Sequence, residues 1–336
     1  MAYTENYNIP PLGKEVMKRL KVAKQAASNI GFAIVEHKDL IGEFDQEDLD
    51  QMLNHVKNLP FEAVNNDDLI RQRCVGYANI YHLNDLLYFL YPEYDPQNGH
   101  FIQSYNLPSD VNPDFKNASG QKPRNYIALD ADLVANKALH KIIHIGYQMS
   151  PLPQEFEDKP MEVEIQFIKY VPRDGQDAVS TPTIVHQDQD WAFCVFLINR
   201  ENVEGGENSF VTKEHVGKEL HEVPKDGVLK RYTFNHLFDG VSVDDQKIGH
   251  HVAPVSLKYG KGTGERTILI LSYKPLVPSR PELYAKPSDS TVADTTSSQV
   301  PKSHESNAVQ TAAFSAAGEA AMESIQPAYM YHDYWF

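Results

Sequence analysis

Apolar residues recur at helical spacing in the N-terminal half of this 336-residue chain. Helices are predicted over residues 13–29, 45–58 and 131–149 because each stretch places its apolar side chains on one helix face. In the first stretch these side chains are Val16, Leu20, Ala23 and Ala27. Asp45 is positioned to cap the first turn of the second helix. We expect the helices to pack on the remainder of the fold.

From about Met161 the pattern changes to short segments in which apolar and polar residues alternate. Such segments predict strands, here 163–170, the residues around His186, 191–198, 209–211, 228–234, 241–243 and 267–273, with two earlier ones at 32–35 and 73–82. Many short strands joined by turns are typical of a sandwich or barrel. The sequence therefore predicts a helical and mixed part over residues 1–160, packed on a β core over residues 161–276.

The last segment, residues 277–336, has a different texture. From about Ser288 to Ala317 it consists of small polar residues without periodicity, a composition that predicts disorder. The chain then ends in a run rich in Tyr, Trp and Phe, residues 328–336. Exposed aromatic clusters usually mark interaction sites. We therefore expect this end to dock on the barrel, on a second copy of the chain or on another partner.

Two histidines and one aspartate form the strongest candidate site. His186 and Asp188 are separated by Gln187, and side chains two apart on a strand share one face. His250 follows much later in the chain. His-x-Asp with a distant His is the ligand pattern of a mononuclear iron(II) centre that keeps three coordination positions open. We therefore expect His186, Asp188 and His250 to bind a metal ion, with no other catalytic side chain required.

Arg266 stands at the start of the apolar, β-branched run 267–273. An arginine at the start of a buried strand is costly unless it has an anionic partner. Its planar guanidinium suits a carboxylate bound through two hydrogen bonds. The sequence therefore predicts a carboxylate-binding position at Arg266.

The segment from about Glu164 to Pro275 resembles the iron(II)/2-oxoglutarate-dependent dioxygenases, most closely the free-amino-acid hydroxylases of the L-isoleucine 4-hydroxylase type. Beyond His186-Gln187-Asp188, the similar stretches are Leu197-Ile198-Asn199-Arg200 with the following Gly205-Gly206, and His250-His251-Val252-Ala253-Pro254. The resemblance implies a double-stranded β-helix (jelly-roll, cupin-like) core with flanking N-terminal helices. It also implies iron(II), dioxygen and 2-oxoglutarate, with the far carboxylate of 2-oxoglutarate on Arg266.

The implied reaction is hydroxylation of an aliphatic carbon of a free L-amino acid, or of a small molecule like one, with release of succinate and CO2. Such a reaction suits the biosynthesis of a non-standard amino acid or natural product. Weaker similarity to the family is found around Arg73, Arg124 and Tyr126, and these residues are candidates for substrate binding. Two alternatives stay open: a desaturase or cyclase for a larger natural-product intermediate, and a cupin-like binding barrel without catalysis.

Other side chains compete for places at the site. His251 stands where the family usually has glycine and is the alternative third ligand, although neighbouring strand residues face opposite sides and only one can bind. His236 is a weaker rival. Asp190 follows Asp188 by two residues and either binds a substrate amine or lies just outside the site. Glu164 and Gln166 alternate on one strand face, so we expect one of them to reach the barrel mouth.

The composition narrows the class of protein. A formal net charge of −15 argues against nucleic acid and against an anionic membrane surface as partners. The two cysteines, Cys74 and Cys194, are far apart and indicate buried thiols rather than a disulfide framework. The first residues carry no apolar signal-peptide core, and no run is long enough for a membrane span. We expect a cytoplasmic enzyme that acts on a small molecule.

Overall fold

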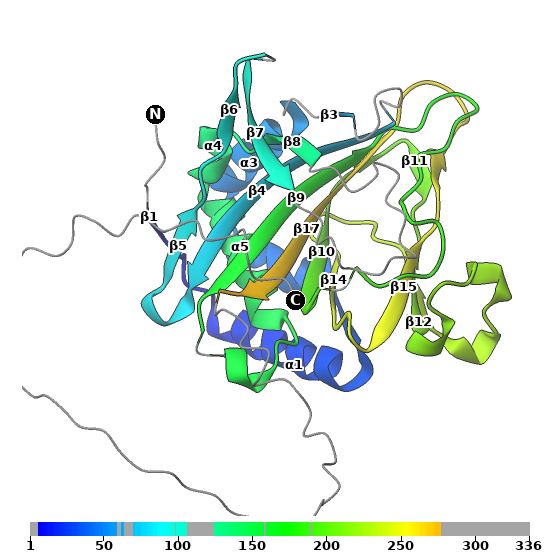
Figure 1. The fold of residues 1–336 in the computed structure, drawn as a ribbon, viewed down its shortest axis with the longest axis horizontal. Helices are drawn as coiled ribbons and strands as arrows, with labels where there is room; N and C mark the ends of the chain where they lie inside the picture. Colours follow the sequence, from blue (N-terminus) through cyan, green and yellow to red (C-terminus); the bar gives the residue numbers. More distant parts are fainter. Residues whose placement is uncertain are drawn as a thin grey trace, which may run out of the picture. The chain divides into compact units, whose positions relative to one another are not determined.

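A large antiparallel β-sheet dominates the fold (Figure 1). The computed structural model describes residues 6–276, except 59–61, 64–69, 98, 106–123, 158 and 189. In spatial order the main path of the sheet is β2 (Phe32–Val35), β14 (Gly240–Val243), β10 (Ala192–Glu201), β17 (Glu265–Pro275), β9 (Met161–Tyr170), β4 (Arg71–Tyr81), β8 (Arg124–Ala128), β7 (His100–Tyr105) and β6 (Glu93–Asp95). The short strands β1 (Asn6–Asn8), β3 (Glu62–Ala63) and β5 (Leu86–Phe89) pair beside this path. Only β4 and β8 pair in parallel among these described strands.

Two smaller sheets complete the β structure. One contains β13 (Val228–Tyr232), β12 (Asn208–Thr212) and β15 (Ile248–Val252), and the other contains β11 (Val203–Gly205) and β16 (Val255–Leu257). The rings of Phe32 and Phe210 stack at 4.7 Å and join the main sheet to the three-stranded sheet. The mainly-β architecture with N-terminal helices that the sequence predicts is thus present in the described part of the chain.

Helices cover one face of the main sheet. They are α1 (Lys14–Ile30), α2 (His37–Leu40), α3 (Gln46–Asn58), α4 (Ala131–Val134) and α5 (Lys137–Met149). The four apolar residues predicted to face inward on α1 are buried, and Gly31 ends the helix in the left-handed conformation that glycine adopts without strain. Asp45 caps α3 by accepting hydrogen bonds from the backbone N–H groups of Glu47 and Asp48. This face of the sheet therefore belongs to the main hydrophobic core.

The prediction of one continuous helix over 131–149 is wrong. Asn136 is extended, and its side-chain oxygen accepts from the backbone N–H groups of Ala138 and Leu139. An asparagine in this role starts a new helix, so α4 ends and α5 begins here. The inward side chains of α5 nevertheless lie in the same core as those of α1.

The strand predicted around His186 is also wrong. His186 makes only an isolated antiparallel bridge, in which its backbone exchanges two hydrogen bonds with that of His250 on β15, at 2.9 and 2.8 Å. On the other side Val185 bonds the backbone of Gly217 and Lys218 in a loop. The segment is therefore held on both sides without belonging to a sheet.

The second face of the main sheet looks into the interior between the sheets. Strand alternation places Phe193, Val195 and Leu197 of β10 on this face with Ile168 of β9 and Ile268 of β17. The neighbouring residues Cys194 and Phe196 belong to the helix-covered side. The site described below opens on the interior face.

Residues Met1–Val277 form one compact unit. The predicted boundary near residue 160 precedes β9, and β9 pairs over its full length with β4 from the N-terminal part. The predicted disordered tail and aromatic end, residues 277–336, lie outside the described residues. Both cysteines are buried free thiols, as predicted.

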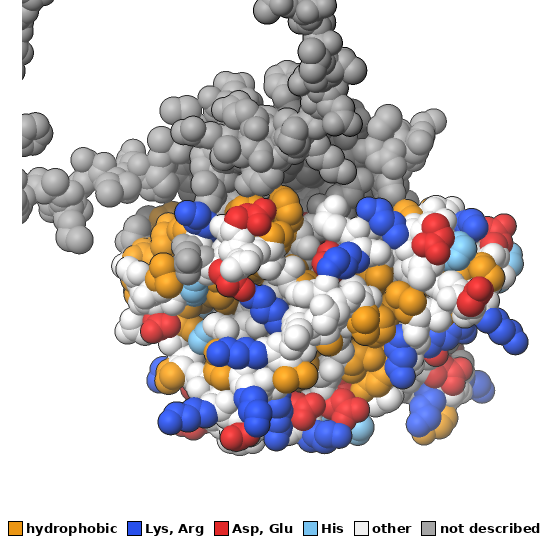
Figure 2. Space-filling model, turned by 90° about the horizontal axis from the view of Figure 1, so that it is seen from below, with side chains coloured by type: hydrophobic (Ala, Val, Ile, Leu, Met, Phe, Trp, Pro, Cys, Tyr) orange, Lys and Arg blue, Asp and Glu red, His pale blue; other side chains and the backbone are white. Residues whose placement is uncertain are grey.

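No helix in the described residues is long and apolar enough to cross a membrane. On the face shown in Figure 2, lysine and arginine side chains are interspersed with aspartate and glutamate side chains.

Candidate metal centre

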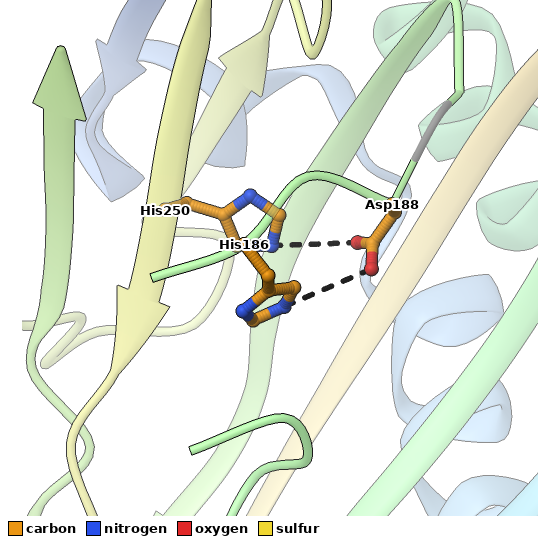
Figure 3. A group of neighbouring side chains, drawn as sticks. All are labelled: His186, Asp188 and His250. Carbon is orange, nitrogen blue, oxygen red and sulfur yellow. Dashed lines mark ion pairs between the residues drawn. The ribbon is translucent and has the colours of Figure 1, made fainter. Parts of the chain in front are cut away.

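His186, Asp188 and His250 meet at the interior face of the fold (Figure 3). One ligand atom from each lies within 4.8 Å of the other two. Nε2 of His186 is 3.7 Å from one carboxylate oxygen of Asp188, and Nε2 of His250 is 3.4 Å from the other. The imidazoles are buried, whereas 48% of the Asp188 side chain is exposed. Three donors converge from one side, and the exposed side leaves room for further ligands.

Backbone contacts orient the first histidine. Nδ1 of His186 lies 2.9 Å from the carbonyl oxygen of Ile184, which favours a proton on Nδ1 and leaves the lone pair of Nε2 facing Asp188. Burial and the neighbouring imidazole of His250 lower the pKa of His186 to about 4, so it is neutral at pH 7. The side chain of Gln187 turns to the backbone of β15, donating to the carbonyl of Ile248 at 3.1 Å.

A second carboxylate stands behind the other histidine. Nδ1 of His250 is 3.6 Å from Oδ1 of Asp245, whose side chain is completely buried. Burial lowers the pKa of His250, but the carboxylates of Asp188 and Asp245 outweigh it and raise the pKa to about 10. The two carboxylates flank the imidazole of His250 and favour a positive charge between them. In a protein that has bound a metal, the ion supplies this charge.

The rival histidines lie outside this group. His251 follows His250 on β15 and its Cα pairs with Ser209 of β12, while His250 pairs with Phe210. His236 is exposed and forms an ion pair with Asp239 at 3.5 Å. Only His186, Asp188 and His250 bring three possible ligand atoms together among the described residues.

Arg266 is completely buried, and none of its three side-chain nitrogen atoms has a hydrogen-bond partner in the described part of the chain. Its guanidinium carbon lies 5.6 Å from the ring centre of Tyr170. Burial lowers the pKa of Arg266 to about 10, so it stays charged at pH 7. A buried, charged and unpaired arginine is costly, and its cost is offset when an anion binds there. A Cβ atom at Gly206 would lie 3.0 Å from Nε, so the glycine leaves this space open.

Of the proposed substrate residues, Arg73, Tyr126 and Asp190 lie on the same interior side or close to it. Arg73 is buried on β4, its Nε has no hydrogen-bond partner among the described residues, and its guanidinium lies 5.2 Å from the ring of Tyr126 on β8. Asp190 follows the metal-site loop, and its carboxylate interacts with Ser272 of β17. Arg124 belongs to β8, but its side chain lies outside the described residues.

Glu164 of β9 and Lys274 of β17 form a charged pair near Arg73 and Asp190. Glu164 is 3% exposed, accepts a short hydrogen bond from Gln166 and lies 3.9 Å from Nζ of Lys274. Burial raises the pKa of Glu164 to about 7, although Lys274 opposes the shift. In the sheet Glu164 pairs with Ser272 on one side and Tyr77 on the other. Both Glu164 and Gln166 are buried, with Glu164 in this charged pair.

Sequence reasoning missed Asp245 and the pairing of Glu164 with Lys274. An acidic residue next to a ligand histidine in space has no spacing signature, because Asp245 reaches His250 through the turn before β15. The alternation of β9 did point to Glu164, but its partner Lys274 depends on the register with β17.

Comparison with known proteins agrees with this geometry. The profile of the 2OG-Fe dioxygenase family matches residues 57–272, which is nearly two thirds of the chain. The chain therefore belongs to the 2OG-Fe dioxygenase family, whose members use iron(II), 2-oxoglutarate and dioxygen.

Among curated proteins it is similar to 3(1)-hydroxy-L-isoleucine 4-dioxygenase of Pantoea ananatis, with 23% identity over 172 residues. The match covers 51% of this chain and 63% of that protein, so the chain spans less than two thirds of this relative.

Two solved structures share the fold. One is IDO from Bacillus thuringiensis, with 15% identity, a TM-score of 0.55, and coverage of 76% of this chain and 99% of that one. The other is a bsmA homolog from Methylobium petroleophilum, with 17% identity, a TM-score of 0.59, and coverage of 80% and 95%.

Proposed function

We propose that this protein is an iron(II)/2-oxoglutarate-dependent dioxygenase that hydroxylates an aliphatic carbon of a free L-amino acid or a similar small molecule. The observation that carries the proposal is a two-histidine, one-carboxylate group on the same interior face as a buried arginine that has no hydrogen-bond partner among the described residues. Nitrogen and oxygen donors suit iron(II), and the arginine suits the far carboxylate of a dicarboxylic cosubstrate.

In this proposal His186, Asp188 and His250 hold the iron, and Arg266 holds 2-oxoglutarate. When bound, the two supply oxidative decarboxylation of 2-oxoglutarate to succinate and CO2, with one oxygen atom of O2 inserted into a C–H bond of the substrate. Asp245 and the Ile184 carbonyl orient the two imidazoles. The apolar residues between the sites, such as Phe193 and Ile268, keep water away from the reacting groups. The main sheet and the two small sheets form the jelly-roll core.

The charges beside the metal group support this substrate class. Arg73 offers a guanidinium to a carboxylate, while Asp190 offers a carboxylate to an ammonium group. This arrangement of charges is complementary to a zwitterion, because each charge of a free amino acid finds the opposite charge. The relative from Pantoea ananatis, named for an L-isoleucine derivative, points to the same class.

The proposal is tested by measuring succinate formed from 2-oxoglutarate. Protein loaded anaerobically with iron(II) is exposed to air with each proteinogenic amino acid and with pipecolate, ornithine or citrulline. We expect one or a few of these compounds to raise the rate and to gain one oxygen atom by mass spectrometry. The rise is expected to vanish in His186→Ala. Succinate formation that no member of the panel stimulates would refute the free-amino-acid substrate.

A further inference from the structure

A second arginine stands beside Arg266. The register of β10 and β17 places Arg200 directly opposite Arg266, and Tyr170 of β9 lies opposite Arg266 on its other side. Directly opposite residues of antiparallel strands share a face, with Cβ atoms roughly 4.5–5.5 Å apart. Arg200, Arg266 and Tyr170 therefore form one row across three strands on the interior face.

A β-bulge produces this pairing. Leu197 pairs with Ile268, but the register then shifts, so that Asn199 pairs with Thr267 and Arg200 with Arg266. In an unshifted register Ile198 would pair with Thr267 and Asn199 would stand opposite Arg266, so that Arg200 would turn to the other face. Bulges commonly redirect a side chain next to a functional site. Here the bulge adds a positive charge to the interior.

No carboxylate of the described residues forms an ion pair with Arg200. Its Nη2 donates to the carbonyl oxygen of Gly205 at 3.0 Å, while its buried Nη1 has no hydrogen-bond partner among the described residues. The nearby carboxylates are engaged elsewhere: Glu207 pairs with Arg231, and Glu265 binds Asn199 and Lys169. Two guanidinium groups thus adjoin the Gly205-Gly206 turn without an anionic partner from the described part of the chain.

Placing two cations side by side costs free energy unless an anion lies between or beside them. Burial lowers the pKa of Arg200 as well as that of Arg266, and no carboxylate of the described residues opposes either shift. A single carboxylate has two oxygen atoms and can accept hydrogen bonds from both groups. The free nitrogen atoms available for this are the three of Arg266 and Nη1 of Arg200.

We propose that Arg200 is a second positively charged residue for the far carboxylate of 2-oxoglutarate, and that it makes the site selective for dicarboxylic 2-oxo acids. The inference rests on the proposed function, because it requires 2-oxoglutarate to lie between the metal group and Arg266. Arg200 acts in binding and takes no part in the reaction itself.

The test is the binding of 2-oxo acids to anaerobic, iron(II)-loaded protein, measured by calorimetric titration. The ligands are 2-oxoglutarate and 2-oxopentanoate, which has the same chain length but a methyl group in place of the far carboxylate. The variants are Arg200→Gln, Arg200→Lys, and Arg231→Gln as a matched control. Arg231 is half exposed and already pairs with Glu207.

We expect Arg200→Gln to weaken 2-oxoglutarate binding about tenfold, because a charge-assisted contact is lost, and to change 2-oxopentanoate binding less than about twofold. Arg200→Lys keeps the charge and is expected to restore most of the affinity, and Arg231→Gln to match the wild type. Equal weakening of both ligands in Arg200→Gln, or no rescue by lysine, would assign Arg200 only to the structure of the Gly205-Gly206 turn and overturn the inference. If the wild-type iron protein binds no 2-oxoglutarate, the proposed function itself fails.

Discussion

Asp245 lies directly behind His250, with its Oδ1 atom 3.6 Å from Nδ1 of the imidazole and its carboxylate completely buried. Nε2 of the same imidazole faces Asp188 at 3.4 Å. A carboxylate on the far nitrogen of a ligand histidine fixes the ring orientation and makes the ligand nitrogen more basic. We therefore expect Asp245 to contribute to metal affinity, although its carboxylate is not one of the three ligand groups.

Replacing Asp245 by Asn tests this role. The amide keeps the shape but removes the negative charge, so we expect iron(II) affinity to fall by about 10–100-fold. Anaerobic titration against a competing chelator measures the change. Asp244→Asn is the matched control, since that carboxylate pairs with Lys247 at 3.3 Å. Equal iron(II) affinities for the two variants would show that Asp245 does not contribute to metal binding.

The choice between the adjacent histidines predicts unequal effects. His250→Ala should abolish stable iron binding, because two protein ligands remain. His251→Ala should leave the iron content unchanged, because its side chain lies outside the ligand group. Metal analysis of protein reconstituted with one equivalent of iron(II) distinguishes them, and circular dichroism reports whether each variant is folded. If His251→Ala lost its iron while His250→Ala kept it, the assignment of the third ligand would be reversed.

Arg266→Met should have opposite effects on stability and binding. Methionine fills a similar volume without burying a charge. We therefore expect the free energy of unfolding of the ligand-free variant to exceed that of the ligand-free wild type by about 1–3 kcal/mol. With iron(II) bound, 2-oxoglutarate at a hundredfold excess over its Kd should stabilise the wild type by about 2.7 kcal/mol and the variant scarcely at all. Denaturant unfolding with and without 2-oxoglutarate measures both. A variant that is destabilised without ligand yet still stabilised by 2-oxoglutarate would contradict the anion-binding role.

The buried carboxyl of Glu164 gives a pH dependence. The unfolded chain releases this proton near the ordinary pKa of 4.5, whereas burial keeps it bound to about 7 in the folded protein. Between these values the folded state binds more protons, so the free energy of unfolding contributed by Glu164 decreases as pH rises from about 4.5 to 7. We expect this decrease to be on the order of 1–3 kcal/mol.

Glu164→Gln should remove that decrease. Urea unfolding of wild type and variant at pH 5 and pH 7.5 isolates it, because the buried histidines titrate in both proteins and cancel in the difference. The stability gap between variant and wild type should widen in favour of the variant at the higher pH. A gap that is the same at both pH values would show that Glu164 is ionised throughout the range.

The sequence anticipated what depends on local periodicity. The apolar spacing of Val16, Leu20, Ala23 and Ala27 was enough to predict α1, and Asp45 marked the start of α3. It failed at Asn136, where a side-chain cap competes with helix continuation, and a helical pattern runs through such a cap unchanged. The strand prediction failed at His186. The extended backbone there is held by a single bridge to β15 and by a loop on the other side, and it does not join a sheet.

At the site, spacing and residue type singled out the three metal-binding candidates and Arg266. The surrounding shell was not predictable, because it depends on register between distant strands. Arg200 faces Arg266 only through the bulge at Ile198, and Asp245 reaches His250 only because a turn precedes β15. A one-residue change in either would move the side chain to the opposite face.

The most direct test of the account is the iron and 2-oxoglutarate content of the protein after anaerobic equilibrium dialysis against both. The wild type should hold one iron(II) and one 2-oxoglutarate per chain. His186→Ala and Asp188→Ala should lose both, and Arg266→Met should keep iron but lose 2-oxoglutarate. If His186→Ala held iron as the wild type does, or if Arg266→Met retained full 2-oxoglutarate, the assignment of this interior face as the dioxygenase site would be contradicted.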